Sequence, residues 1–207
     1  MNLKTMLVAT DFSEPSRSAI VRAAALAAAA AGSRIEILHA IDRLSLQSLR
    51  RLLTSSPADA ERELVEKANI ELRHLSESLT RHNALNVETL VTIGNVAGEI
   101  ARRAEELDAS LVVLGARGAN FVREAFLGTT AEKVVRKTSR PLLVVRSPAA
   151  EPYRRVLVPV DFSPHSRNAL DLARVIAPRA SHLVLHAFEV PFESQLRYAS
   201  VDEDTVA

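Results

Sequence analysis

Apolar residues recur along this chain in short continuous runs that alternate with longer stretches of helical period. The runs at 4–10, 35–41, 87–93, 111–114 and 141–146 predict strands. The intervening stretches at 13–31, 44–53, 57–82, 96–107 and 130–138 predict helices. Short strands without polar alternation are typical of a parallel sheet covered on both faces. The pattern therefore predicts an α/β fold with a doubly wound, five-stranded parallel sheet, flavodoxin-like or Rossmann-like.

The opening of the chain is repeated 150 residues later. Leu7–Ser13 reads LVATDFS and Leu157–Ser163 reads LVPVDFS. After a loss of three residues, Leu38–Ala40 matches Leu185–Ala187, both LHA. A duplicated unit explains so many matched positions better than chance does.

The second copy is incomplete, because it covers a strand, a helix and a strand only. We expect a first domain at 1–147, a proline-containing linker at 148–153, and a partial second unit at 154–207 with a mobile tail. About 50 residues bury too little apolar surface to be stable alone. We therefore expect the partial unit to pack on the first copy or on a second chain, as in a homodimer.

Composition narrows the classes of function. Basic and acidic residues nearly balance, 26 against 25, so a dedicated nucleic-acid binder is not expected. Cysteine is absent, which excludes disulfides and zinc–thiolate sites. The longest apolar stretch, 23–31, is far shorter than the roughly 20 residues that span a bilayer, so we expect a cytoplasmic protein without a membrane partner.

The most informative chemistry lies in a glycine pattern between a strand and a helix. Gly115 and Gly118 follow the run 111–114, and after nine more residues Gly128 precedes a helix. Small residues let a backbone approach phosphates, and amide groups at a helix start favour an anion. A flexible surface loop is the alternative reading. Asp11 ends the first strand, and with a flavodoxin-like order both strand ends would border one crevice. Asp11 could instead cap the first helix or orient the loop.

No catalytic or metal constellation accompanies this pattern. His39 and His186 occupy equivalent places in the two copies, so duplication explains both. The sequence has no Gly-x-x-x-x-Gly-Lys loop and no Gly-x-Ser-x-Gly turn. We expect a binding protein and not an efficient enzyme, with slow ATP hydrolysis at most.

With these residues placed, the chain resembles the universal stress proteins. The ATP-binding branch of that family carries Gly, two residues, Gly, nine residues, Gly, then Ser or Thr, which Gly115, Gly118, Gly128 and Thr129 match. The resemblance covers 1–147 and, as a partial copy, 154–190. It implies ATP as the ligand, with or without Mg²⁺ on its phosphates, dimerisation, and a role in stress adaptation.

The resemblance also implies a set of binding residues. Asp11 would contact the ribose or adenine; Ala9, Thr10 and Ala40 would line the base pocket; Leu114 and Gly115 would border base and sugar; Gly118, Gly128, Thr129 and Thr130 would approach the phosphates. Ala131 belongs to the same region but departs from the family, where a hydroxyl residue is common. Arg117 and Arg123 could pair with phosphates or remain solvated. Three functions stay open: an ATP-binding stress regulator, a nucleotide-free interaction protein of the same fold, and a slow ATPase.

Overall fold

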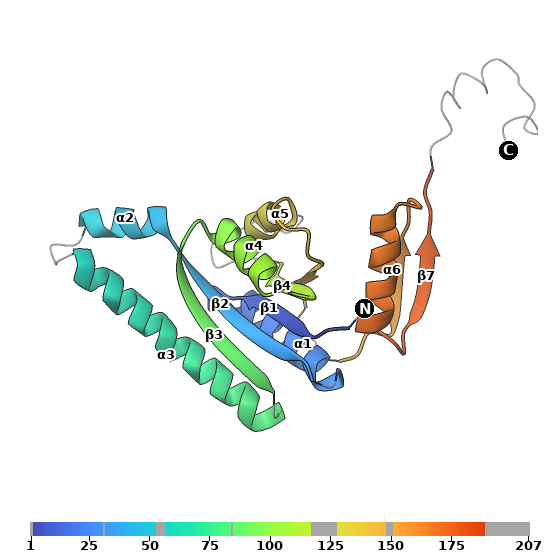
Figure 1. The fold of residues 1–207 in the computed structure, drawn as a ribbon, viewed down its shortest axis with the longest axis horizontal. Helices are drawn as coiled ribbons and strands as arrows, with labels where there is room; N and C mark the ends of the chain where they lie inside the picture. The colour runs from blue at the N-terminus through green and yellow to red at the C-terminus, as the bar shows by residue number, and fades with distance from the viewer. Residues whose placement is uncertain are drawn as a thin grey trace, which may run out of the picture. The chain divides into compact units, whose positions relative to one another are not determined.

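The computed structural model describes residues 2–30, 32–52, 57–83, 85–116, 128–147 and 151–188. The chain divides into two compact units, Met1–Glu151 and Pro152–Ala207. The expected tail at 200–207 lies outside the described residues. The first unit contains a five-stranded parallel sheet, and the second contains two parallel strands and a helix (Figure 1).

The elements of the first unit alternate as the hydrophobic pattern predicts. They are β1 (Thr5–Ala9), α1 (Glu14–Ala29), β2 (Arg34–Asp42), α2 (Arg43–Leu52), α3 (Pro57–Asn83), β3 (Asn86–Gly94), α4 (Val96–Glu106), β4 (Leu111–Gly115), α5 (Thr129–Val135) and β5 (Leu142–Val145). Helix α5 ends three residues earlier than expected. Its C-terminal cap is Arg136, in the right-handed region, and the backbone amides of 137 and 138 still bond to Val134.

The strand order is β3-β2-β1-β4-β5, so β1 lies between β2 and β4. The expected α/β class and parallel sheet are confirmed. The order is that of the first five strands of a Rossmann sheet and not the flavodoxin order, in which the first strand lies beside the third. Strands β1 and β4 are nevertheless adjacent, because Met6–Val8 pair with Leu111–Val113.

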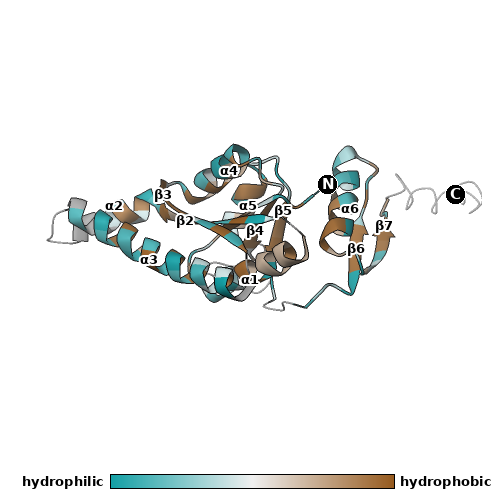
Figure 2. Ribbon diagram, turned by 60° about the horizontal axis from the view of Figure 1, so that its bottom comes forward, coloured by the Kyte–Doolittle hydropathy of each residue, from teal (hydrophilic) through white to brown (hydrophobic). Residues whose placement is uncertain are grey.

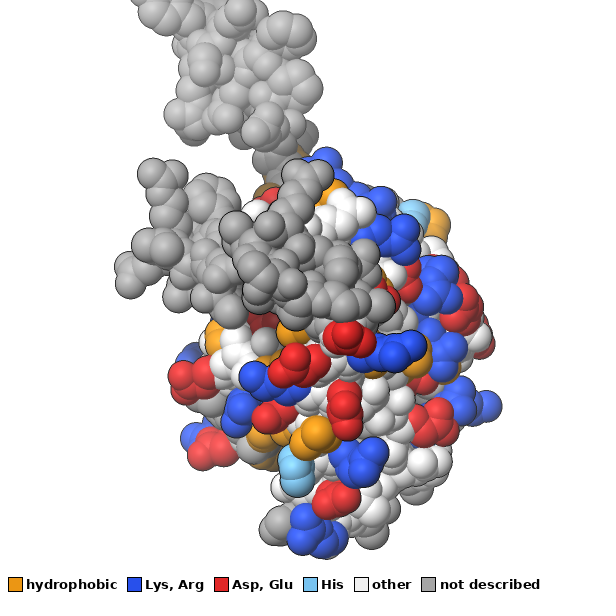
Figure 3. Space-filling view, turned by 90° about the vertical axis from the view of Figure 1, so that its left-hand side faces the viewer, with side chains coloured by type: hydrophobic (Ala, Val, Ile, Leu, Met, Phe, Trp, Pro, Cys, Tyr) orange, Lys and Arg blue, Asp and Glu red, His pale blue; other side chains and the backbone are white. Residues whose placement is uncertain are grey.

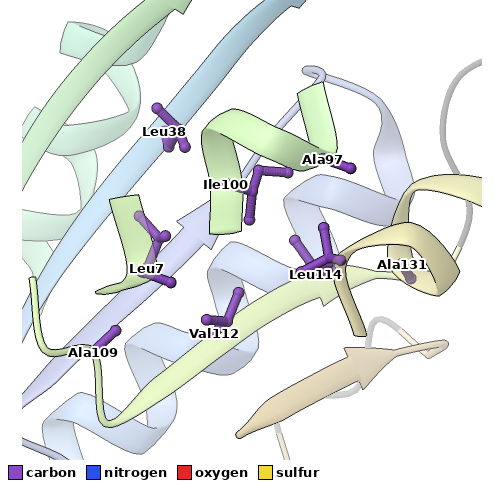
Figure 4. Packing of buried hydrophobic residues seen from close by; sticks show 10 residues of the cluster. Leu7, Leu38, Ala97, Ile100, Ala109, Val112, Leu114 and Ala131 are labelled. Atoms are coloured by element: carbon purple, nitrogen blue, oxygen red, sulfur yellow. The ribbon is translucent and has the colours of Figure 1, made fainter. Parts of the chain in front are cut away.

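The core lies on both faces of this sheet. Helix α1 packs across β1, β2, β4 and β5 and contacts α3, while α4 and α5 contact each other over the opposite face (Figure 1). On the α4 side, residues from three strands and two helices converge in one cluster (Figure 4). Its most deeply buried members are Leu7, Leu38, Ala104, Val112 and Val134, each with 0% exposure.

A buried ion pair joins β2 to α4 beside that cluster. The Arg103 side chain donates from Nε and Nη2 to the two carboxylate oxygens of Glu36, each at 2.7 Å. The Glu36 side chain is only 4% exposed. Both oxygens of this buried charge are therefore matched by a bidentate cation, as burial of a carboxylate requires.

The second unit repeats the first three elements of the first. It consists of β6 (Arg155–Pro159), α6 (Pro164–Ile176) and β7 (Ser181–Leu185). Hydrophobic residues run along both strands (Figure 2). Leu157 and Leu185 are 57% and 48% exposed, whereas their equivalents Leu7 and Leu38 are fully buried beneath α4.

The position of Glu36 is also changed in the second unit. Glu36 pairs with Leu7 across β1 and β2, and the equivalent pair across β6 and β7 is Leu157 with Leu183. Leu183 is 65% exposed. In the second unit, an apolar strip formed by Leu157, Leu183 and Leu185 therefore lies on the face where the first unit has a carboxylate bound by a residue of α4.

The surface formed around α3 carries acidic and basic side chains closely intermixed over its described part (Figure 3). This agrees with the near balance of charges in the sequence. Within the ranges that the structure describes, no helix combines the length and apolar character needed to cross a bilayer.

Candidate functional site

The candidate site is the edge of the sheet where β1 and β4 end. The strand order reverses there, because β1 connects onward to β2 on one side and has β4 on its other side. In open parallel sheets, ligands bind outside the carboxyl ends of strands at such a reversal. Asp11, which follows β1, and Gly115, which ends β4, therefore lie at the same edge of the sheet.

Asp11 forms a tight turn with the start of α1. Its Oδ1 accepts from the Ser13 backbone amide at 3.1 Å and also from the Ser13 hydroxyl. Ser13 is the N-cap residue of α1, as expected, but its side chain makes no capping bond of its own. Asp11 thus orders the turn before the helix, which agrees with the loop-orienting alternative and not with a helix cap, and its side chain remains exposed at the sheet edge.

Thr10 lies beneath this turn and is 6% exposed. Its hydroxyl lies 2.9 Å from the Ser16 hydroxyl and accepts from the Phe12 amide at 3.0 Å. The Thr10 side chain therefore holds the turn from below and points toward α1.

Ala9 and Ala40 are half-buried and lie on the other face. Alternation along the strands puts them on the side of Leu7 and Leu38, one step nearer the carboxyl edge. Ala9 packs against the buried cluster below α4. The strand ends therefore carry two small side chains at this edge on the α4 side.

Gly115 ends β4 against the first turn of α1. A Cβ added there would lie 2.7 Å from both the carbonyl carbon and oxygen of Pro15, and 3.0 Å from the Ser16 nitrogen. The structure thus supplies a packing reason for this glycine that the sequence interpretation did not include.

Leu114 and Ala131 belong to the core below the edge. They are 4% and 2% exposed, and both point into the cluster drawn in Figure 4. The Ala131 side chain is directed toward buried apolar residues. The position where many family members carry a hydroxyl residue therefore faces the core in this chain.

Gly128, Thr129 and Thr130 open α5. Gly128 is the buried N-cap residue, and its amide donates to the Ala116 carbonyl at 2.9 Å. Thr129 and Thr130 are exposed. The remaining expected phosphate contacts, Arg117, Gly118 and Arg123, lie outside the described residues.

Two further residues at this edge were missed by sequence reasoning. Phe12 has a φ of 64°, a left-handed conformation that is unusual for a bulky side chain. The ring of His39 lies 4.4 Å from the Phe12 ring, and its Nδ1 lies 2.8 Å from the Thr10 carbonyl oxygen. The signal was the recurrence of Asp-Phe-Ser and Leu-His-Ala in both copies, which had been read as duplication alone.

The acidic groups near this edge are engaged in turns. Asp42 at the end of β2 accepts hydrogen bonds from the Ser45 amide and hydroxyl. The hydrogen bond from the Ser45 amide lowers the pKa of Asp42 more than any other contact does. Over the described ranges, no three His, Asp or Glu side chains converge closely enough to hold a metal ion.

Comparison with known proteins gives a consistent result. Residues 2–146 match the model of the universal stress protein family. "Universal stress protein YxiE" from Bacillus subtilis is 30% identical over 146 residues, covering 68% of this chain and 97% of its own length. "Universal stress protein MJ0577" from Methanocaldococcus jannaschii is 26% identical over 154 residues, covering 69% and 94%.

Two solved structures extend the comparison to three dimensions. That of MJ0577 superimposes with a TM-score of 0.62 and 25% identity, over 71% of this chain and 98% of that one. A protein from Archaeoglobus fulgidus matches with a TM-score of 0.69 over 96% of this chain and 73% of its own. At 22% identity the second likeness concerns the fold alone, but it extends beyond the first unit.

Proposed function

Because this chain belongs to the universal stress protein family, we propose that it binds ATP at the carboxyl edge of β1 and β4 and acts as a regulatory protein. Membership itself supports a role in the stress response. The finer proposal is that bound nucleotide controls the conformation or the association of the protein, within a homodimer or between its two units.

One observation carries the proposal. Asp11 follows β1, the glycine segment follows β4, and these two strands are adjacent and parallel at the reversal of strand order. A carboxylate that can bind ribose hydroxyls and a segment of small residues that can approach phosphates then flank the same edge. Ala9 and Ala40, both small, support room for a base on the α4 side.

The residues divide into three groups by chemistry. The exposed Asp11 carboxylate suits the sugar or base, as an acceptor of hydroxyl or amino hydrogens. The partly buried Ala9 and Ala40 suit the apolar face of adenine. The polyphosphate would be met by backbone amides around Gly128 and by the Thr129 and Thr130 hydroxyls, with Mg²⁺, where present, held by the phosphates themselves.

The absence of an assigned catalytic base in this proposal is deliberate. Phosphoryl transfer needs a positioned nucleophile in addition to charge neutralisation. Asp11 Oδ1 is already bound by Ser13, so this carboxylate is ordered for recognition and orientation. We therefore propose binding as the function, with any hydrolysis slow.

The experiment uses the duplicated turn as its own control. Asp161 accepts from the Ser163 amide at 3.0 Å, as Asp11 does from Ser13, but no glycine segment accompanies it. Thermal unfolding should be measured with and without Mg-ATP for the natural protein, Asp11→Asn and Asp161→Asn. At an ATP concentration about 100 times the Kd of the natural protein, the free energy of unfolding of the natural protein and of Asp161→Asn should rise by about 2.7 kcal/mol. At the same concentration, that of Asp11→Asn should rise much less.

A second candidate is an interaction protein of the same fold that binds no nucleotide. The uncovered apolar strip of Leu157, Leu183 and Leu185 favours it, because exposed apolar patches mark association surfaces. The same experiment separates the two candidates. Equal unfolding temperatures with and without saturating Mg-ATP would reject ATP binding and leave the interaction protein.

A further inference from the structure

The turn that carries Asp11 rests on a residue in a costly conformation. Phe12 has a φ of 64°, and a bulky residue persists there only when its surroundings hold it. Its amide donates to the Thr10 hydroxyl at 3.0 Å, and its carbonyl accepts from Arg17 Nε at 3.2 Å. Its ring lies 4.4 Å from that of His39. The backbone on both sides of Phe12 and its side chain are thus all engaged.

Besides its ring contact with Phe12, His39 makes a hydrogen bond to the backbone just after β1. Its Nδ1 lies 2.8 Å from the Thr10 carbonyl oxygen. A carbonyl can only accept, so Nδ1 must carry the hydrogen, and in the neutral ring Nε2 is then the acceptor. The contact therefore specifies one tautomer. One imidazole therefore contacts both the carbonyl of Thr10, the residue after β1, and the ring of Phe12, the residue after Asp11.

The second unit shows which parts of this arrangement are essential to it. Phe162 has a φ of 63°, its ring lies 4.6 Å from that of His186, and His186 Nδ1 lies 2.8 Å from the Val160 carbonyl oxygen. Val160 replaces Thr10 and has no hydroxyl to offer. The histidine, the carbonyl and the left-handed phenylalanine persist together where the hydroxyl contact is lost.

We propose that His39 is a positioning residue of the nucleotide site, which as the Nδ1–H tautomer holds the Thr10 carbonyl and Phe12 and thereby sets the direction of the Asp11 carboxylate. This inference rests on the proposed function for its effect on ATP. Its geometric part concerns the turn alone. His39 lies on the face opposite Ala40, so it acts through the turn and not by touching the base.

Two substitutions distinguish the hydrogen bond of His39 Nδ1 from the contact of its ring with Phe12. His39→Asn keeps an N–H donor near the place of Nδ1, whereas His39→Phe keeps a ring beside Phe12 and removes the donor. His39→Phe should weaken ATP binding roughly tenfold, as loss of one ordering hydrogen bond implies, and His39→Asn should stay within about threefold of the natural protein. His186→Phe breaks the equivalent bond in the second unit and should leave ATP affinity unchanged.

Nuclear magnetic resonance supplies readouts that need no ATP. Long-range ¹H–¹⁵N correlations should show His39 protonated at Nδ1 with Nε2 unprotonated at alkaline pH. The amide–Hα coupling of Phe12, which depends on φ, should be the same in the natural protein and His39→Asn and should change in His39→Phe. An Nε2–H tautomer, or an unchanged coupling in His39→Phe, would overturn the inference.

The two proposals fail differently. If the natural protein binds ATP and His39→Phe binds it equally well, the positioning role is wrong while the proposed function stands. If the natural protein binds no ATP but the tautomer and coupling are as stated, the proposed function is wrong and His39 positions a turn of other use.

Discussion

Replacing Gly115 by alanine should destabilise the protein even when no nucleotide is present. The new Cβ would lie 2.7 Å from two backbone atoms of Pro15, against a normal contact of 3.4 Å or more. Those atoms belong to the first turn of α1 and cannot rotate away, so β4 and α1 would have to separate by several tenths of an ångström. Overpacking of this kind costs typically 1–3 kcal/mol, and we expect about 2 kcal/mol here.

The assay is urea unfolding of the nucleotide-free protein, with Gly32→Ala as the matched control. Gly32 has a φ of 79° and no atom within 4 Å of an added Cβ, so its substitution tests backbone conformation without crowding. We expect about 1 kcal/mol for that control. Gly115→Ala as stable as the natural protein would refute the packing argument and return this glycine to a role in ligand approach alone.

Three other predictions follow from contacts elsewhere. Arg103→Met should lower the free energy of unfolding by about 3 kcal/mol, because it leaves the buried Glu36 carboxylate unpaired. Arg102→Met, which removes two surface ion pairs, should lower it by under about 1 kcal/mol, and equal losses would contradict the distinction. Hydrogen bonds from Arg140 first, and then from Thr138 and Ser139, lower the pKa of Glu105 to about 2, so the contribution of the ionised Glu105 to stability is complete above pH 4.5 and is lost as the pH falls toward 2. Arg140→Gln should flatten part of that acid limb of the stability curve, and an unaltered limb would show that other carboxylates dominate it. Amides of β6 and β7 should exchange with deuterium much faster than those of β1 and β4, since one face of the two-stranded sheet is uncovered in the described structure; equal protection would mean that another surface covers that face in solution.

The fold could be predicted from the sequence because its signals are local. Continuous apolar runs identify buried parallel strands, and the repeat of Leu7–Ser13 at 157 identifies the second unit. Strand order is a different matter, because it is decided by packing between distant segments. The flavodoxin-like order was therefore wrong, although the expectation that the ends of these two strands border the same edge agrees with the pairing of β1 with β4.

The site could be predicted only as a set of neighbouring positions. Asp11 and Gly115 do lie at one edge, but the close approach of Gly115 to Pro15, which leaves no space for a Cβ, depends on a helix–strand distance that no sequence pattern encodes. Ala131 lies in the buried cluster where α5 contacts α4, an arrangement of distant segments that the sequence does not encode locally. His39 was explained by duplication, since its bond to Thr10 requires the register of two strands.

The most direct test of the account is an amide chemical-shift titration of the natural protein with Mg-ATP. The account predicts shifts that centre on Asp11, Ala40, Gly128 and Thr129 and saturate together, with the equivalent Asp161 turn of the second unit unchanged. Shifts confined to α3 or to the second unit, or no shifts at saturating ATP, would contradict it.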